Sequence, residues 1–397
     1  MSSAVPPAPD FRSPEFLLRH VADTMAFYHP RCIDPAGGFF HFFRDDGSVY
    51  DARTRHLVSS TRFVFNYAMA WRHFREPAYR DAVAHGIAYL RDAHRDRESG
   101  GYAWLLRDGE PVDRTNHCYG LAFVMLAYAK AIEAGYAAAR DHLDETWALM
   151  ERRFWDADAG LYADEADAHW CVAPYRGQNA NMHACEALLA AFDATGAAHF
   201  LERAATLADH MTRRQAALAG GLVWEHYDPQ WQPDWQYNKD DRSNIFRPWG
   251  FQPGHQAEWA KLLLILDRHV PRAWHVERAR ELFDESVPRA WDATHGGLVY
   301  GLDRQLGVYD DDKYFWVQAE SLAAAALLAR RTGDSKYWTW YERIWAYGWR
   351  HFVDHRFGAW YRILRRDNTH YSDEKSPAGK TDYHTMGACH EVLNVVS

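Results

Sequence analysis

Cysteine is scarce in this sequence, and no hydrophobic stretch approaches the length of a membrane span. The five cysteines are scattered and form no Cys-x-x-Cys pair: Cys32, Cys118, Cys171, Cys185 and Cys389. This pattern disfavours a disulfide framework and a zinc site, and it predicts reduced thiols. No window reaches the roughly 18 uncharged apolar residues of a transmembrane helix, and residues 1–10 lack the basic and apolar segments of a signal peptide. We therefore expect a cytoplasmic protein.

An excess of positive charge is also missing. Lys and Arg number 45 against 54 Asp and Glu, which gives a formal net charge of -9. Binding to phosphate backbones or to anionic lipid needs a basic face, so neither nucleic acid nor a membrane is expected as a partner. The sequence lacks both common nucleotide-binding motifs, namely G-x-G-x-x-G between a strand and a helix and G-x-x-x-x-G-K-S/T. It also lacks the esterase motif G-x-S-x-G. The sequence therefore predicts no cofactor of this kind.

Aromatic residues, by contrast, are abundant, with 18 Trp, 22 Tyr and 20 Phe. Aromatic rings stack on the C–H faces of sugars, so a pocket rich in Trp is typical of carbohydrate binding. Bulky residues also fill the cores of large helical proteins. Composition alone leaves both explanations open.

A glycine-containing turn recurs six times and organises the chain. Its copies are Gly37-Gly38-Phe39, Gly100-Gly101-Tyr102, Ala159-Gly160-Leu161, Gly220-Gly221-Leu222, Gly296-Gly297-Leu298 and Phe357-Gly358-Ala359. Successive second positions are separated by 59 to 76 residues. Such a period is the signature of a repeat architecture, and glycine supplies the positive φ that a tight turn needs.

Two kinds of helix alternate between these turns. Apolar residues at three-to-four spacing predict Ala- and Leu-rich buried helices over residues 62–74, 117–132, 181–194, 256–266, 317–329 and 383–392. Amphipathic helices are predicted over residues 14–28, 78–94, 140–154, 198–215, 272–291 and 335–352. Twelve helices in six pairs favour an all-α fold, an (α/α)6 barrel that forms a single domain over residues 13–397 behind a tail of residues 1–12. An open solenoid is the alternative, but its repeats are usually shorter, about 34 to 47 residues.

The longest interval between turns contains an insertion at residues 228–254. It holds Trp231, Trp235 and Trp249 together with four prolines. Either a lid beside a pocket or a packed surface loop is compatible with this composition.

Polar and aromatic residues gather at the start of each predicted inner helix. They are Arg62, His117, Tyr119, Asn179, His183, His255, Glu258, Trp316, Glu320 and His384. Every inner helix follows a turn in the same sense, so these positions are expected at one mouth of the barrel. Burying such groups without partners is costly, and their recurrence therefore predicts a ligand pocket there. Pairs at i, i+3 and i, i+4 can present two side chains to one ligand, and Glu258 is placed to orient His255.

Histidines and glutamates together could also bind a metal ion. Imidazole and carboxylate ligands suit zinc or manganese, but no H-E-x-x-H or comparable ligand run is present. We therefore expect no metal.

The motifs at the helix starts resemble those of the N-acylglucosamine 2-epimerase superfamily over nearly the whole chain. The matching segments are Arg62, Asn179-Ala-Asn-Met-His183, Pro253-Gly-His255-Gln-Ala-Glu258, Phe315-Trp316-Val-Gln-Ala-Glu320 and Lys380-Thr-Asp-Tyr-His384. That superfamily comprises sugar 2-epimerases and aldose–ketose isomerases acting on mannose, built on an (α/α)6 barrel and independent of metal. Residues 56–62 and the ending after Lys380 are more similar to those of the mannose isomerases. A single Trp at Phe315-Trp316, where cellobiose 2-epimerases commonly carry two, points the same way.

The resemblance implies a role for each matching residue. His384 resembles the base that removes the proton next to the sugar carbonyl, and His255, held by Glu258, resembles the second acid/base. His183 resembles the group that assists ring opening, and Arg62 the residue that binds the oxygens at C1 and C2. Sugar-contacting positions are matched by Asn179, Trp316, Glu320 and, more loosely, Tyr119.

Four functions remain open from the sequence. The favoured one is an isomerase that interconverts a monosaccharide aldose and its ketose, D-mannose and D-fructose, through a cis-enediolate. A sugar 2-epimerase uses the same chemistry, and both histidines are present for either outcome. Two alternatives come from other classes of protein. One is a glycoside hydrolase that uses Glu258 and Glu320 as paired carboxylates, and the other is a sugar-binding protein without catalytic activity. A homodimer formed through the outer helices also stays open.

Overall fold

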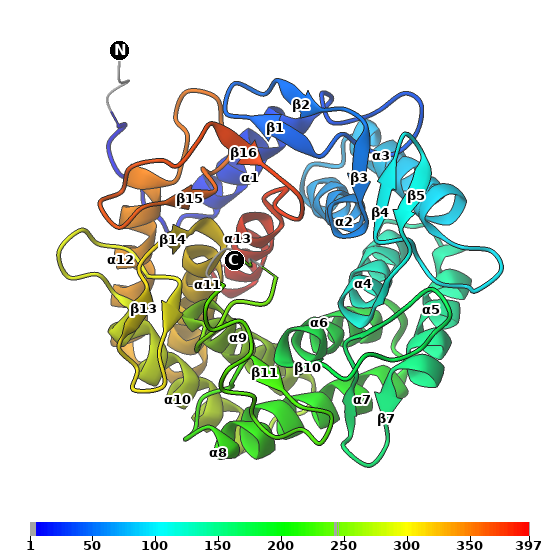
Figure 1. Cartoon of the computed structure of the whole chain (residues 1–397). Coiled ribbons are helices and arrows are strands. Elements are labelled where there is room, and N and C mark those ends of the chain that lie inside the picture. Colours follow the sequence, from blue (N-terminus) through cyan, green and yellow to red (C-terminus); the bar gives the residue numbers. More distant parts are fainter. Residues whose placement is uncertain (1–4, 242–243, 245, 397) are drawn as a thin grey trace.

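In the part of the chain that the structure describes, residues 5–241, 244 and 246–396, a ring of six inner helices is surrounded by six outer ones (Figure 1). In this computed structural model the inner helices are α2 (Leu57–Phe74), α4 (Cys118–Glu133), α6 (Gln178–Thr195), α9 (Pro253–His269), α11 (Phe315–Thr332) and α13 (Tyr383–Val396). The outer helices are α1 (Pro14–Tyr28), α3 (Pro77–Tyr89), α5 (Ala139–Arg153), α7 (Ala198–Asp209), α10 (Ala273–Ala290) and α12 (Ser335–His351). Two π-helical turns, η1 (Leu90–His94) and η2 (His210–Gln215), extend α3 and α7, and the short α8 (Ala216–Leu218) follows η2.

The ring is closed. Each inner helix packs against the next, and α13 packs against α2, so the last helix meets the first. Each outer helix covers an inner neighbour, and α1 at the start of the chain lies on α13 at its end. Closure excludes an open solenoid and confirms the (α/α)6 barrel.

Small and aliphatic side chains allow the inner helices to approach one another. Four consecutive alanines on α11, residues 323–326, are completely buried, as is most of α4. A helix that is apolar on all sides must be covered on all sides, and this explains why these helices form the inner ring. The amphipathic helices bury one face only, as in α12, where Tyr337, Tyr341 and Trp345 face inward.

Short antiparallel strands of two to four residues follow the recurring turns. They are β1 (Phe42–Arg44), β2 (Val49–Asp51), β3 (Thr54–His56), β4 (Leu105–Arg107), β5 (Glu110–Asp113), β6 (Asn116–His117), β7 (Trp155–Asp156), β8 (Leu161–Tyr162), β9 (Glu165–Ala166), β10 (Arg176–Gly177), β11 (His226–Tyr227), β12 (Gly301–Leu302), β13 (Val308–Asp310), β14 (Lys313–Tyr314), β15 (Ile363–Leu364) and β16 (Glu374–Ser376). Strands β3, β6, β10 and β14 end directly before α2, α4, α6 and α11. Each of them pairs with a strand from the following repeat, namely β4, β9, β11 or β15. These pairings hold the first turns of the inner helices at one mouth of the barrel.

The turns need glycine for two reasons, conformation and space. Gly38 has a φ of +70°, and a Cβ there would lie 2.6 Å from the ring of Tyr89. Gly297 has a φ of +79°, and its Cβ would lie 2.4 Å from the ring of Tyr347. Both positions therefore combine a left-handed backbone with close approach of an outer helix or its end.

The tryptophans of the insertion at residues 228–254 pack against the barrel. Trp231 and Trp249 are buried, and the indole of Trp235 lies 4.6 Å from that of Trp224. Phe246 in the same segment lies at the pocket described below. Among the described residues, all five cysteines are free, and no helix is long and apolar enough to cross a bilayer.

Candidate active site

A pocket of about 700 Å³ opens at the mouth where the inner helices begin. Every inner helix contributes to its wall, through Arg62, Tyr119, Asn179, His183, His255, Glu258, Trp316 and His384. The remaining lining residues are Phe246, Tyr300, Tyr314, Phe315, Arg362, Pro377, Ala378, Gly379 and Lys380. Eight of the ten residues singled out from the sequence thus line one cavity.

His384, in the first turn of α13, is oriented by a buried carboxylate. Its Nδ1 lies 2.7 Å from Oε1 of Glu320 on α11. An ionised carboxylate only accepts hydrogen bonds, so Nδ1 carries the proton and Nε2 is the nitrogen left for a ligand. Burial, followed by the charge of Arg62, holds the pKa of His384 well below its ordinary value. The ring is therefore a neutral base at physiological pH.

His255, in the first turn of α9, has the same arrangement with a different partner. Its Nδ1 lies 2.9 Å from Oε1 of Glu225, a buried residue just before β11. The Nε2 of Gln178 lies 3.0 Å from the second Glu225 oxygen and from the same ring nitrogen. The expectation that Glu258 orients His255 was wrong. Glu258 lies on the same helix, but Glu225 approaches the ring from the segment between the fourth turn and β11.

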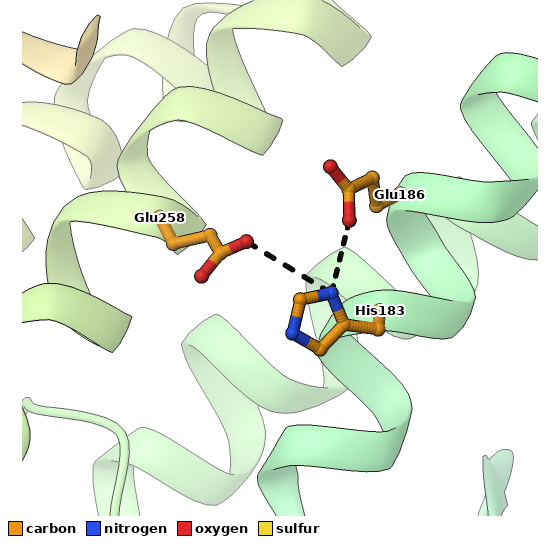
Figure 2. A group of neighbouring side chains, drawn as sticks. All are labelled: His183, Glu186 and Glu258. Atoms are coloured by element: carbon orange, nitrogen blue, oxygen red, sulfur yellow. Dashed lines mark hydrogen bonds and ion pairs between the residues drawn. The ribbon is translucent and has the colours of Figure 1, made fainter. Parts of the chain in front are cut away.

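His183 on α6 is the third histidine at the pocket. Its Nδ1 lies 2.9 Å from Oε2 of Glu186 and 3.9 Å from Oε1 of Glu258, so the ring points toward both carboxyl groups (Figure 2). Burial lowers the pKa of His183, although Glu186 opposes this. The edges of Tyr119 and Phe123 pack against the same ring.

Arg62 is a buried cation without a matching anion. Its guanidinium lies over the rings of Phe123 and Tyr383, at 4.5 and 4.7 Å. It donates hydrogen bonds to the carbonyl of Gly379 and to the hydroxyl of Tyr119. No carboxylate lies within ion-pair distance of it in the described part of the chain. A positive charge held in this way at a pocket wall suits a ligand on which negative charge develops.

Two further side chains present unsatisfied oxygens. Neither carboxyl oxygen of Glu258 has a hydrogen-bond partner among the described residues, and the same holds for Oδ1 of Asn179. Burial, followed by the nearby charge of Glu320, raises the pKa of Glu258 well above its ordinary value. Protonation of Glu258 is therefore favoured, and in its neutral form it can donate a hydrogen bond. Buried polar atoms at a pocket wall normally find partners, and a hydroxyl-rich ligand supplies them.

Aromatic rings form the rest of the wall. The indole of Trp316 lies 4.9 Å from the ring of His255 and 5.7 Å from that of His384. Tyr300 and Tyr314 are stacked at 3.9 Å beside it. The two histidines therefore share one flat apolar surface.

Two of the residues singled out from the sequence do not line the pocket. His117 caps α4, packs on Trp104 at 4.1 Å and lies 3.4 Å from Glu165. Glu320 lies beneath the wall, between His384 and Lys261. Glu320 thus acts on a histidine rather than on a ligand.

Sequence reasoning missed four groups of this site: Glu186, Glu225, Lys261 and Arg362. Glu186 follows His183 by three residues, the spacing that was noticed for His255 and Glu258. Lys261 likewise follows Glu258 by three. Glu225 and Arg362 lie outside the helices, where periodicity carries no signal.

The carboxylates beneath the pocket already have a cation. His183, Glu186 and Glu258 form one group whose ligand atoms lie within 4.8 Å of one another, and Glu258, Glu320 and His384 form another. However, the ammonium of Lys261 lies 2.5 Å from Glu320 and 3.8 Å from Glu258. The Nδ1 atoms of both histidines are bonded to carboxylates and have no lone pair to offer. These residues fit a protein ammonium group, not a metal ion.

Comparison with known proteins agrees with this geometry. A family model described as N-acylglucosamine 2-epimerase matches residues 38–388. A D-mannose isomerase from Marinomonas mediterranea is 56% identical over 391 residues, which cover 98% of this chain and 99% of that protein. A D-mannose isomerase from Thermobifida fusca is 40% identical over 291 residues, 70% of each chain. A crystal structure of D-mannose isomerase superposes with a TM-score of 0.96 at 56% identity, covering 98% of this chain and 99% of the other.

Proposed function

This chain belongs to the N-acylglucosamine 2-epimerase family and is a sugar isomerase of the aldose–ketose type, and from that premise we propose that it interconverts D-mannose and D-fructose. One structural observation carries the proposed mechanism. Two histidines, His255 and His384, each bind a buried carboxylate through Nδ1 and line one pocket with Arg62. The sugar is suggested by the names of the relatives.

The first half of the reaction moves a proton from carbon to His384. In the open-chain aldose, the carbonyl at C1 weakens the C2–H bond. Nε2 of His384 takes this proton, the C2–H electron pair forms the C1–C2 double bond, and the carbonyl electrons move onto O1. Arg62 stabilises the resulting cis-enediolate, since a guanidinium can span two adjacent oxygens.

The second half delivers a proton to C1. His384 exchanges the proton taken from C2 with solvent and then protonates the neighbouring carbon C1, which yields the ketose. His255 transfers the remaining proton between O2 and O1, so no net charge is left on the sugar. Return of the proton to C2 from the opposite face would give the 2-epimer instead, which is the alternative outcome of the same site.

A glycosidase mechanism does not suit this arrangement. Glu320 hydrogen-bonds with Lys261 and with His384, and it lies outside the pocket wall. A hydrolytic pair needs two carboxyl groups that flank the scissile bond. Only Glu258 of the two faces the cavity.

Exchange in deuterated water tests this function. The protein, treated with EDTA, is incubated with D-mannose in deuterium oxide and followed by NMR. Fructose that carries deuterium at C1 is the expected product. Glucose that carries deuterium at C2 would contradict the isomerase in favour of the epimerase, and unchanged mannose would contradict both.

Glu258 provides a prediction about protonation. Glu258→Ala should lower kcat/KM by about 10- to 100-fold, because it removes a buried partner of a sugar hydroxyl. Glu258→Gln should stay within a few-fold of the wild type, because the amide imitates the neutral acid. The raised pKa of Glu258 means that its neutral form is lost only as the pH rises through that value.

Steady-state kinetics across pH checks this. Wild-type kcat/KM should fall on the alkaline side, whereas the Gln variant should lack that part of the decline. If Glu258→Gln and Glu258→Ala lowered kcat/KM equally, the ionised carboxylate of Glu258 would be the form that the reaction requires.

A further inference from the structure

Lys261 is a buried lysine directly beneath the pocket. It lies on α9, one turn beyond Glu258, and is only 6% exposed. Its ammonium lies 2.5 Å from Oε2 of Glu320, 3.8 Å from Oε1 of Glu258 and 4.0 Å from Oε1 of Glu186. It does not line the pocket and does not reach the substrate. A lysine is rarely buried without such partners, and here three helices supply them.

Glu320 connects this lysine to the catalytic site. One of its oxygens accepts from Lys261, and the other lies 2.7 Å from Nδ1 of His384. The tautomer of His384 depends on the state of this carboxyl group. An ionised Glu320 keeps the ring proton on Nδ1, whereas a protonated Glu320 would donate to Nδ1 and move the ring proton to Nε2. In the second case His384 would present N–H to the sugar and could not act as a base.

Three buried carboxyl groups cannot all ionise without a cation. With Lys261 removed, desolvation and mutual repulsion favour uptake of a proton by the group. We propose that Lys261 is a positioning residue for the isomerase reaction: it keeps Glu320 ionised and thereby keeps Nε2 of His384 free to accept the substrate proton. The inference deepens the proposed function and rests on it.

The charges around Lys261 agree with this role. Burial acts to lower the pKa of Lys261, but Glu320, Glu258 and Glu186 together raise it, so the ammonium stays charged across the working range. Burial raises the pKa of Glu320, and Lys261 is the main group that opposes this. The charged and titratable groups that face this cluster are Arg62 on α2, His183 and Glu186 on α6, Glu258 on α9, Glu320 on α11, and Tyr383 and His384 on α13, where Tyr383 donates a hydrogen bond to Glu186.

Three variants of Lys261 separate charge from packing. Lys261→Met removes the charge, Lys261→Gln keeps a hydrogen-bond donor without charge, and Lys261→Arg keeps the charge. We expect Met and Gln to lower kcat at pH 7 by about 100-fold, the low end of the effect of a general base, with KM nearly unchanged. Activity should recover as the pH is raised, because Glu320 then ionises again. The Arg variant should retain most of kcat and the wild-type pH profile.

Lys130 offers a matched control. It is a buried lysine on α4, 8% exposed, that pairs with Glu133 and not with Glu320. Lys130→Met should leave the pH profile of kcat unchanged. Thermal unfolding, monitored by circular dichroism, establishes which variants are folded. If Lys261→Met does not fold, Lys261→Gln provides the variant without the charge.

The tautomer can be observed without turnover. In ¹⁵N-histidine NMR spectra, assigned with a His384→Ala variant, the proton of His384 should move from Nδ1 to Nε2 in Lys261→Gln. This measurement stays informative even if the wild type converts no mannose, so it fails independently of the proposed function. A uniform loss of activity at every pH, with the proton still on Nδ1, would overturn the inference.

Discussion

His384→Ala is expected to abolish most of the isomerase activity, with kcat lower by about 10²- to 10⁴-fold and KM little changed. The reason is that no other side chain in the proposed mechanism accepts the proton from carbon. Incorporation of solvent deuterium at C1 should disappear in parallel. The lowered pKa of His384 adds a pH dependence: the neutral base is lost only as the pH falls through a value below 6.5, so wild-type kcat/KM should stay level down to that range.

His390 provides the control for this substitution. It lies on the same helix, α13, and is buried to the same extent, 6% exposed against 6% for His384. However, it contacts His73 and lies outside the pocket. His390→Ala should keep wild-type kcat, whatever it costs in thermal stability. If His384→Ala retained more than about a tenth of kcat, another base would have to be sought.

Helix positions were predictable because their signal is local. The predicted helix at residues 317–329 corresponds to α11 (Phe315–Thr332), and the one at residues 62–74 to α2 (Leu57–Phe74). The missing residues lie at the helix ends, namely residues 57–61 of α2 and residues 315–316 and 330–332 of α11, where polar and aromatic side chains interrupt the apolar period. The π-helical turn η1 could not be predicted from the sequence either. It continues α3 directly, and only its hydrogen-bonding period differs from that of an α-helix.

Closure of the barrel was predictable only through the repeat. No local sequence pattern predicts the contact between α13 and α2. Six similar repeats joined by one type of turn, however, favour a closed ring of helices. The constancy of the turn has a physical basis. Aspartate carboxylates at its start accept backbone N–H groups in five of the copies, through Asp34, Asp96, Asp156, Asp292 and Asp354.

The lining of the pocket was predictable because its residues begin the inner helices, whereas the hydrogen-bond partners of those residues on other elements were not. Asn179 and His183 lie four residues apart on α6, and both line the pocket. The orienting partners of His255 and His384 come instead from other elements, namely Glu225 before β11 and Glu320 on α11. Spacing along one helix suggested Glu258 for His255, and tertiary packing placed a different carboxylate there.

Arg62→Met is expected to lower kcat/KM by about 10²- to 10³-fold, the usual effect of removing a group that stabilises an oxyanion. In the structure, Gly379 and Tyr119 hold the guanidinium at the wall, and no carboxylate neutralises it within the described residues. Its charge is therefore available to the enediolate. The loss should appear mainly in kcat, because the negative charge on the sugar oxygens exists only after proton removal. Arg62→Lys should recover part of the activity, since an ammonium supplies the charge but cannot span two oxygens.

Arg55 distinguishes catalysis from folding in this experiment. It is buried to a similar extent, 4% exposed against 5% for Arg62, but it is paired with Asp34 at 2.6 Å. Arg55→Met leaves the half-buried carboxylate of Asp34 without its cation, which should lower folding stability, while kcat of the folded enzyme should be retained. Arg62→Met leaves no anion unpaired, so its melting temperature should fall less although its kcat falls far more. If the two variants lost kcat and stability in the same proportion, Arg62 would be a structural residue, and stabilisation of the enediolate would have to come from elsewhere in the pocket.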